Sequence, residues 1–293
     1  MKWRDRKQSR NVEDRRSSSG RLGGGGGRGL PSIGTLMFLW PLVKPLLRSK
    51  LGMAVVGVGA AAYFFMPSLM GGGGSSKPVS EAADDEQAAF IKTVMADTET
   101  VWGNVFAQAG ERYPEAKLVL YRGGTRSGCG PASAGMGPFY CPSDQKVYVD
   151  LSFFDELKRK HGAGGDFAQA YVLAHEVGHH IQNMEGTLDK VQRAKQQVRG
   201  NDDNKLQVMV ELQADCYAGV WTNHAQKKFK ILEAGDLEEA LTAAASIGDD
   251  RLQKQAQGFA IPHTFTHGSS KQRVEWFSRG VKSGLLKDCN TFN

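Results

Sequence analysis

Residues 170–186, with the sequence AYVLAHEVGHHIQNMEG, place three histidines and a glutamate inside an otherwise apolar run. On a helix, His175 and His179 project from one face with about 40° between them, so their imidazoles can bind one metal ion. Glu176 lies about 100° from His175, close enough to reach a metal-bound water without binding the metal itself. His180 lies about 140° from His175 and is predicted to be a packed or helix-capping histidine instead of a ligand.

A catalytic metal site needs a third protein ligand, and residues 206–221, LQVMVELQADCYAGVW, offer one. Glu211 and Asp215 lie four residues apart on a second apolar helix, where burying two carboxylates is costly unless a cation compensates. One Zn²⁺ bound by Glu211 supplies that cation, and Asp215 can accept the second ring N–H of His175 or His179. The alternatives are a helix with core histidines at residues 170–186 and a surface helix with solvated acids at residues 206–221. A shared metal ion accounts for both patterns at once.

The positive charge of the chain is concentrated at its N-terminal end. Residues 1–50 hold 12 Lys/Arg against 3 Asp/Glu, a net charge of +9, whereas the whole chain carries +6. Residues 51–70 then run for 20 residues without a charge, about the length of a helix that crosses a bilayer. Because positive charge stays on the cytoplasmic side, we expect a single-pass signal anchor with residues 71–293 outside. A buried core helix and a cleaved signal peptide are the alternatives.

These features divide the chain into four parts. We expect residues 1–50 to form a basic, glycine-rich cytoplasmic tail that is largely disordered, because low-complexity segments cannot bury a core. Residues 71–80 are predicted to be a flexible linker, and residues 81–293 the folded domain. The implied location is the bacterial inner membrane, with the domain in the periplasm or outside the cell. A basic tail can bind nucleic acid, but the apolar run beside it favours a membrane, so no nucleic acid is expected.

The cysteines agree with this topology, since all four lie within residues 81–293. An even number of cysteines in an oxidising compartment indicates disulfide bonds. Of the three possible pairings we favour Cys129–Cys141, which closes a short glycine-rich loop, with Cys216–Cys289, which ties the C-terminus to a helix. A structural zinc bound by all four cysteines is the alternative, but the chain has no C-x-x-C pair.

Within residues 81–293, apolar periodicity and turn residues predict mostly helices and a small sheet. Helices are expected over 85–110, 167–185, 204–226, 236–257 and 270–284, and strands over 116–121, 137–141 and 146–151. Asp166 and Gln169 form a capping-box-like start for the second of these helices, and Gly186 is its natural end. The predicted fold class is therefore α+β, preceded by one transmembrane helix.

HEVGHH, followed some thirty residues later by ELQADCYAG, resembles the bacterial predicted neutral zinc metallopeptidases, of the gluzincin type with H-E-x-x-H and a downstream E-x-x-x-D. SGCGPASAGMGPFYCPSDQKVYVDLSFFDEL, GDFAQAYVLAHEVGHHIQN and THGSSKQRVEWFSRG are similar to that family too, so the resemblance covers nearly the whole chain. It implies a zincin-like fold, with His175, His179 and Glu211 as zinc ligands and Glu176 as a catalytic residue. These motifs are not specific to a substrate.

For such a site we expect an endopeptidase that hydrolyses peptide bonds through a zinc-bound water activated by Glu176. The tetrahedral oxyanion needs a further donor, and His267 in TFTHGSSKQR is the first candidate, before Tyr217 and His263. Residues 146–150, KVYVD, are expected to bind the substrate backbone as an edge strand. The alternative is a catalytically silent, membrane-tethered metal-binding scaffold. The intact Glu176 favours the enzyme, because a purely structural site needs no general base.

Overall fold

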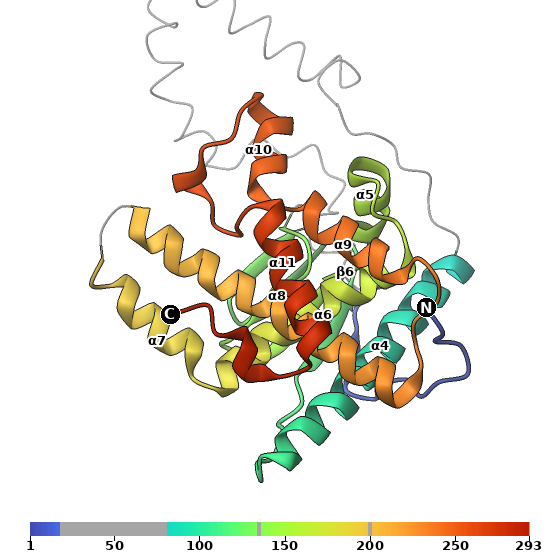
Figure 1. Cartoon of the computed structure of the whole chain (residues 1–293). Coiled ribbons are helices and arrows are strands. Elements are labelled where there is room, and N and C mark those ends of the chain that lie inside the picture. The colour runs from blue at the N-terminus through green and yellow to red at the C-terminus, as the bar shows by residue number, and fades with distance from the viewer. Residues whose placement is uncertain (18–80, 134–135, 199–200, 293) are drawn as a thin grey trace, which may run out of the picture. The chain divides into compact units, whose positions relative to one another are not determined.

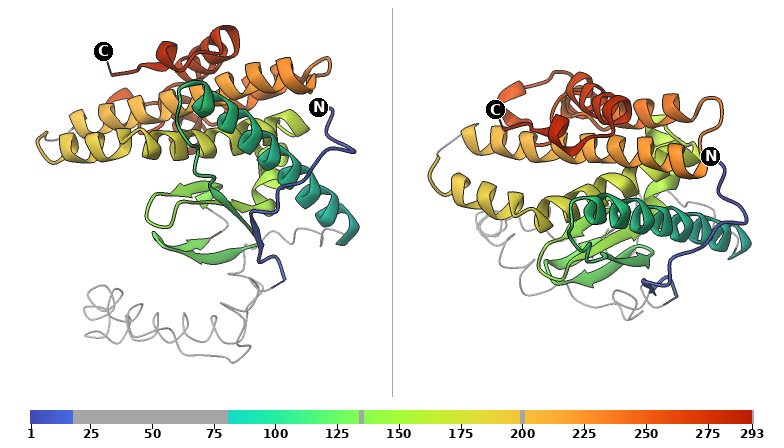
Figure 2. Two further views of the ribbon diagram at one scale, coloured as in Figure 1. Left: turned by 90° about the horizontal axis from the view of Figure 1, so that it is seen from below. Right: turned by 60° about the horizontal axis from the view of Figure 1, so that its bottom comes forward.

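The computed structural model describes residues 1–17, 81–133, 136–198 and 201–292. Helices form most of this part of the chain, and two small sheets lie against one side of the helical layer (Figure 1, Figure 2). The domain is therefore mostly helical with small sheets, as its sequence predicts.

The longest helices form the centre of the domain: α4 (Glu81–Gln108), α6 (Asp166–Met184), α8 (Asn201–Phe229) and α11 (Ser270–Ser283). Shorter helices and two 3-10 turns connect them: α5 (Leu151–His161), α7 (Thr187–Lys195), α9 (Asp236–Ser246), α10 (Asp249–Gln257), η3 (Pro262–Thr264) and η4 (Leu286–Cys289). The expected helix over 236–257 is divided into α9 and α10, because Ile247 and Gly248 leave helical geometry between them.

Glycines lie where the central helices cross, and they let the backbones approach closely. A Cβ added to Gly178 of α6 would lie 3.0 Å from the backbone oxygen of Ala214 on α8. One added to Gly280 of α11 would lie 2.0 Å from the backbone oxygen of Cys216, also on α8. Helix α8 is therefore held between α6 and α11, so side chains from all three helices can converge. Large, fully buried side chains fill the space around them: Trp102, Phe167, Tyr171, Trp221 and Phe277.

The main sheet has four strands in the order β1-β2-β6-β5. Strands β1 (Val12–Asp14), β2 (Lys117–Tyr121) and β6 (Lys146–Asp150) are parallel, and β5 (Phe139–Cys141) is antiparallel to β6. A separate hairpin consists of β3 (Gly124–Ser127) and β4 (Gly130–Ser133). The expectation that residues 146–150 form an edge strand is wrong, because β6 pairs with β2 on one side and with β5 on the other.

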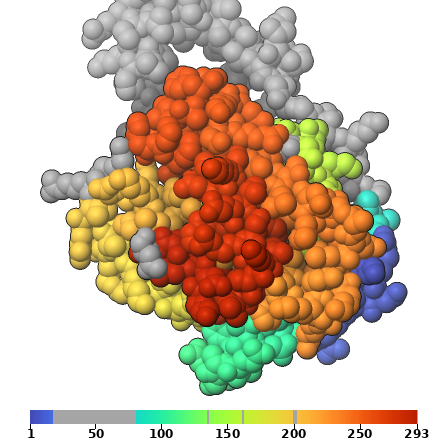
Figure 3. Space-filling view, in the orientation of Figure 1, coloured from blue at the N-terminus to red at the C-terminus, as the bar shows by residue number. Residues whose placement is uncertain are grey.

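Residues 1–17, here called the N-terminal strap, belong to the folded domain (Figure 3). Strand β1 lies within the strap and pairs with β2, and Met1 is buried. The expectation of a disordered tail therefore does not hold for these residues. Composition alone marks the strap as too charged to fold, but its basic side chains find acidic partners on α4, as Arg6 does with Asp97.

Helix α6 begins at Asp166, one residue before its expected start, and Gly165 is its N-cap. The expected capping box of Asp166 and Gln169 is not formed, because Gly165 has no side chain to cap with. The Asp166 carboxylate instead accepts hydrogen bonds from the α-amino group of Met1, at 2.9 Å to each oxygen. The strap thus contacts the first residue of α6.

The fold-class prediction needs a correction at its transmembrane helix. Among the described residues, none of the helices combines the length and the apolar composition that a membrane crossing requires. Helices α4 and α8 are long enough, at 28 and 29 residues, but both carry charged side chains along their length. The expected anchor at 51–70, the expected linker at 71–80 and residues 18–50 of the expected tail lie outside the described residues.

Candidate metal centre

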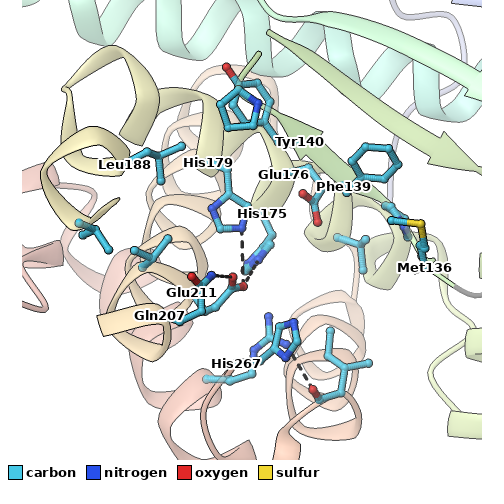
Figure 4. Close-up of a pocket in the computed structure, with 18 of the residues that line it drawn as sticks. Met136, Phe139, Tyr140, His175, Glu176, His179, Leu188, Gln207, Glu211 and His267 are labelled. Atoms are coloured by element: carbon cyan, nitrogen blue, oxygen red, sulfur yellow. Dashed lines mark hydrogen bonds and ion pairs between the residues drawn. The ribbon is translucent and has the colours of Figure 1, made fainter. Parts of the chain in front are cut away.

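Two histidines of α6 and one glutamate of α8 form a cluster with the geometry of a metal site (Figure 4). Nitrogen atoms of His175 and His179 and a carboxylate oxygen of Glu211 all lie within 4.8 Å of one another. Oε2 of Glu211 is 3.2 Å from Nε2 of His175 and 3.6 Å from Nε2 of His179. Gln207, one turn earlier on α8, donates to the other oxygen of Glu211 at 2.8 Å and so orients that carboxylate.

Hydrogen bonds at the opposite ring nitrogens set the orientation of both imidazoles. Nδ1 of His175 lies 2.8 Å from Oδ1 of Asp215, and Nδ1 of His179 lies 2.8 Å from Oε1 of Gln182. Each partner atom is an acceptor, so Nδ1–H donates and the lone pair of the neutral ring stands at Nε2. Nε2 of each ring therefore faces Glu211, which is the arrangement that one shared cation requires.

The charges of the cluster favour a cation. Burial alone would lower the pKa of His175, but Asp215 and Glu211 raise it to about 10. Burial would raise the pKa of Glu211, but the two histidines hold it well below its usual range. Two imidazoles and one carboxylate are a donor set that zinc accepts with an open fourth position. The residues present therefore fit a zinc ion, which would take the place of the proton on His175.

Asp215 lies at the centre of a buried polar network behind His175. Its side chain is fully buried, and Arg273 of α11 donates to it through Nε at 2.8 Å and through Nη2 at 2.9 Å. The hydroxyl of Tyr171 donates to Oδ1 of the same carboxylate at 2.5 Å. Burial would raise the pKa of Asp215, but Arg273 and His175 lower it to about 2. Asp215 is therefore an ionised acceptor that fixes the ring of His175, as its position on the helix predicts.

Glu176 lies beside the cluster without joining it. Its side chain is on the Phe139 side of His175, and both residues line the same cleft (Figure 4). Burial raises the pKa of Glu176, while the charges of His175 and His179 oppose that rise. A carboxylate with a raised pKa next to a metal site is suited to accept a proton and to release it again.

The cleft in front of the cluster has a volume of about 560 Å³. Strand β5 forms one wall through Phe139 and Tyr140, and α7 forms another through Leu188 and Val191. The segment between α10 and α11 closes a third side with His267. Leu188 of α7 and Phe139 of β5 lie on opposite sides of His175 (Figure 4), and the Cys129–Cys141 disulfide ties down the end of β5.

His267 is the expected oxyanion donor that the structure places in the cleft. Its Nδ1 lies 3.2 Å from Oδ1 of Asp249, a hydrogen bond that raises the pKa of His267. Its backbone N–H donates to Oδ2 of Asp249 at 2.6 Å, which holds the loop. Tyr217 donates to Glu185 at 2.6 Å, and neither Tyr217 nor His263 is among the residues that line the cleft. These two secondary candidates are therefore misplaced for the role.

The remaining predictions for single residues have clear outcomes. His180 is fully buried and bonded to the hydroxyl of Tyr140 and the carbonyl of Pro114, so it is a packed histidine. Both disulfide bonds form in the favoured pairing, Cys129–Cys141 and Cys216–Cys289.

Sequence reasoning missed part of the site. Gln182 lies three residues after His179, and Gln207 lies four residues before Glu211, so helical spacing could have indicated both. Arg273 is different: the sequence favours it as a residue that orders its segment or pairs with an acid, and it does pair with an acid, Asp215, 58 residues away, but no local pattern identifies that partner.

A buried cluster of two histidines and a glutamate, with a further glutamate between the histidines in H-E-x-x-H spacing, defines the class of zinc peptidases. The family model described as "Putative neutral zinc metallopeptidase" matches residues 1–292, and the chain belongs to this family.

Named relatives share much of the sequence. The chain is similar to the uncharacterized protein YpfJ of Escherichia coli (strain K12), with 48% identity over 294 residues that cover 100% of this chain and 99% of that protein. It is also similar to the uncharacterized protein Rv2575 of Mycobacterium tuberculosis (strain H37Rv), with 44% identity over 191 residues that cover 62% of this chain and 64% of that protein. No solved structure matches the chain.

Proposed function

We propose that this protein is a zinc-dependent endopeptidase. One observation carries the proposal: His175, His179 and Glu211 converge at the wall of a cleft in which Glu176 stands beside them. A structural zinc site would be closed by four protein ligands and would need no neighbouring base. The three-ligand set at a cleft supports catalysis instead.

Nε2 of both histidines and Oε2 of Glu211 would hold the zinc ion, which supplies a Lewis acid that activates water and polarises the scissile carbonyl. Glu176 accepts a proton on its carboxylate and delivers it to the leaving amine. Its raised pKa brings it closer to the working pH, which suits both transfers. His267, with Nδ1 held by Asp249 and its pKa raised, donates Nε2–H to the developing oxyanion.

Strand β5 is the element that we propose to bind the substrate backbone. It is an end strand of the sheet, and Phe139 and Tyr140 line the cleft. An extended peptide can add to such an end strand by main-chain hydrogen bonds. This assignment replaces β6, which is central in the sheet.

The disulfide bonds support a proposal about the compartment. Disulfides persist in oxidising surroundings such as the bacterial periplasm and the cell exterior. Both pairs are formed here, and one of them ends the cleft-lining strand β5. We place the peptidase domain in such a compartment.

The test uses the full chain, loaded with zinc and incubated with a diverse peptide library. Wild type is compared with Glu176→Gln and with Glu275→Gln, a control at a glutamate whose side chain is 58% exposed on α11. New peptide termini are counted by mass spectrometry, and bound zinc by metal analysis. We expect cleavage by wild type and by the control, and a rate about 10²- to 10⁴-fold lower for Glu176→Gln. If all three bind one zinc and none cleaves, the peptidase proposal fails in favour of a metal-binding scaffold.

A further inference from the structure

The N-terminal strap occupies a groove that residues 81–293 build for it. The backbone N–H of Leu118 on β2 donates to the carbonyl of Asn11 at 3.0 Å, and the N–H of Arg15 donates to Leu120 at 2.7 Å. The strap therefore supplies a parallel strand along an edge of β2 that would otherwise lie at the end of the sheet. Unpaired strand edges are ready templates for another strand.

Side chains of the strap are buried along the groove as well. Met1 and Ser9 are each 6% exposed, and the N–H of Ser9 donates to the carbonyl of Lys92 on α4 at 2.9 Å. The indole of Trp3 meets the ring of Phe90 edge-on, with the ring centroids 5.4 Å apart. In Figure 3 the strap lies at the surface beside the start of α4. It thus contacts both the sheet and α4.

The charges of strap and groove are complementary. The strap holds seven Lys/Arg against three Asp/Glu, whereas α4 has acidic residues in its first turn and along its strap-facing side. Arg16 pairs with Asp84 at 2.6 Å, and Arg6 pairs with Asp97. Asp97 is 3% exposed, so the strap brings the cation to a buried carboxylate. An uncompensated carboxylate in that position would be strongly unfavourable.

From these contacts we infer that the groove of β2 and α4 is a strand-acceptor site, and that residues 1–17 are its resident docking peptide. Apart from its continuation into residue 18, the strap is held by non-covalent contacts alone. No disulfide can tie it to the groove, because all four cysteines lie between positions 129 and 289. If the connection at residues 18–80 is cut, the strap stays in place and the domain remains folded in two pieces. The acceptor site then selects a short basic peptide with an aromatic residue at position 3 and arginines at positions 6, 15 and 16.

The docked strap also supports a wall of the cleft. The guanidinium of Arg15 lies 5.9 Å from the ring centroid of Tyr148 on β6. Tyr148 in turn stacks on Phe139, with ring centroids 4.9 Å apart, and Phe139 lines the cleft. The acceptor site is thus connected to the candidate metal centre by two aromatic rings, although strap binding requires no peptidase activity.

The test uses the full chain with a recognition sequence for a site-specific protease inserted after Ser19. The folded protein is cut, and its pieces are followed by size-exclusion chromatography and mass spectrometry. We expect the N-terminal piece to co-elute with the remainder in a 1:1 ratio, and to separate from it only in denaturant. Its dissociation constant is then measured by displacement with a labelled peptide of residues 1–17.

Variants give the inference its sharper test. Arg6→Met should raise the dissociation constant by about tenfold or more, since a buried charged hydrogen bond is lost. Arg10→Met is the matched control, at an exposed arginine of the same strap, and should leave the constant unchanged. Separation of the pieces after cutting, equal effects of the two variants, or co-elution at twice the mass through exchange between copies would each overturn the inference. None of these readouts depends on whether the protein cleaves peptides.

Discussion

Replacing Arg273 by methionine should destabilise the metal-free protein by about 3 to 5 kcal/mol, the usual cost of leaving one partner of a buried ion pair alone. The side chains of Arg273 and Asp215 are 3% and 0% exposed, so water cannot replace the lost cation. Methionine keeps much of the length of the arginine side chain, so the loss reflects charge and hydrogen bonding more than volume. Since small domains have about 5 to 15 kcal/mol of stability in all, the effect is large.

The assay is urea unfolding of the metal-free protein, with Asp215→Asn combined with Arg273→Met as the control. The double variant buries a neutral pair and should recover part of the loss, because neutral replacements of buried ion pairs are often tolerated. Wild-type stability due to the low pKa of Asp215 is present above about pH 4 and lost as the pH falls towards about 2. In Arg273→Met this acid loss should be smaller, because without the guanidinium the pKa of Asp215 is less depressed in the folded state.

Zinc affinity gives a second readout for Arg273→Met. Because Asp215 orients His175, disturbing it should weaken zinc binding by about 10- to 100-fold in competition with a chelator. A stability loss below about 1 kcal/mol, or a double variant less stable than the single one, would falsify the reasoning about the buried pair.

Three further predictions concern other parts of the molecule. Zinc affinity should rise by about tenfold per pH unit between pH 6 and 8 for each proton displaced, because His175 is protonated in the metal-free site. A zinc affinity that does not change with pH would contradict this. Gly280→Ala should lower the unfolding free energy by about 1 to 3 kcal/mol or more, since its Cβ meets the Cys216 carbonyl, whereas Gly103→Ala, with nothing within 4 Å, should be neutral or stabilising. Burial raises the pKa of Asp97 to about 7, against the effect of Arg6. Stability should therefore fall as the pH rises from about 4 to 7. In thermal unfolding, Asp97→Asn should flatten this dependence of stability on pH.

The candidate metal site could be predicted largely because helical periodicity is local. His175 and His179, and likewise Glu211 and Asp215, are four residues apart, so their shared face follows from the helix alone. The meeting of the two helices could be inferred because each carried ionisable groups that only the other could compensate. Asp249 lies at the start of α10 and Arg273 lies on α11, both far from His175 and Glu211 in the sequence. No local pattern therefore connects these two residues with the site.

The sheet shows where sequence reasoning fails. Residues 146–150 have the alternation of a strand, but whether a strand is central or at the edge depends on its neighbours, and both partners of β6 lie elsewhere in the chain. The prediction that the strap is disordered fails for a related reason. Its charge density indicates disorder only if no partners exist, and its partners on α4 begin more than sixty residues later.

The pairing of β1 with β2 has a topological consequence. The strap and residues 81–293 share a sheet, so they belong to one folded body although more than sixty residues separate them in the chain. A path that crosses a membrane once would leave its two ends on opposite sides, where these strands could not pair. The arginines of the strap serve as counter-ions for acidic side chains of α4.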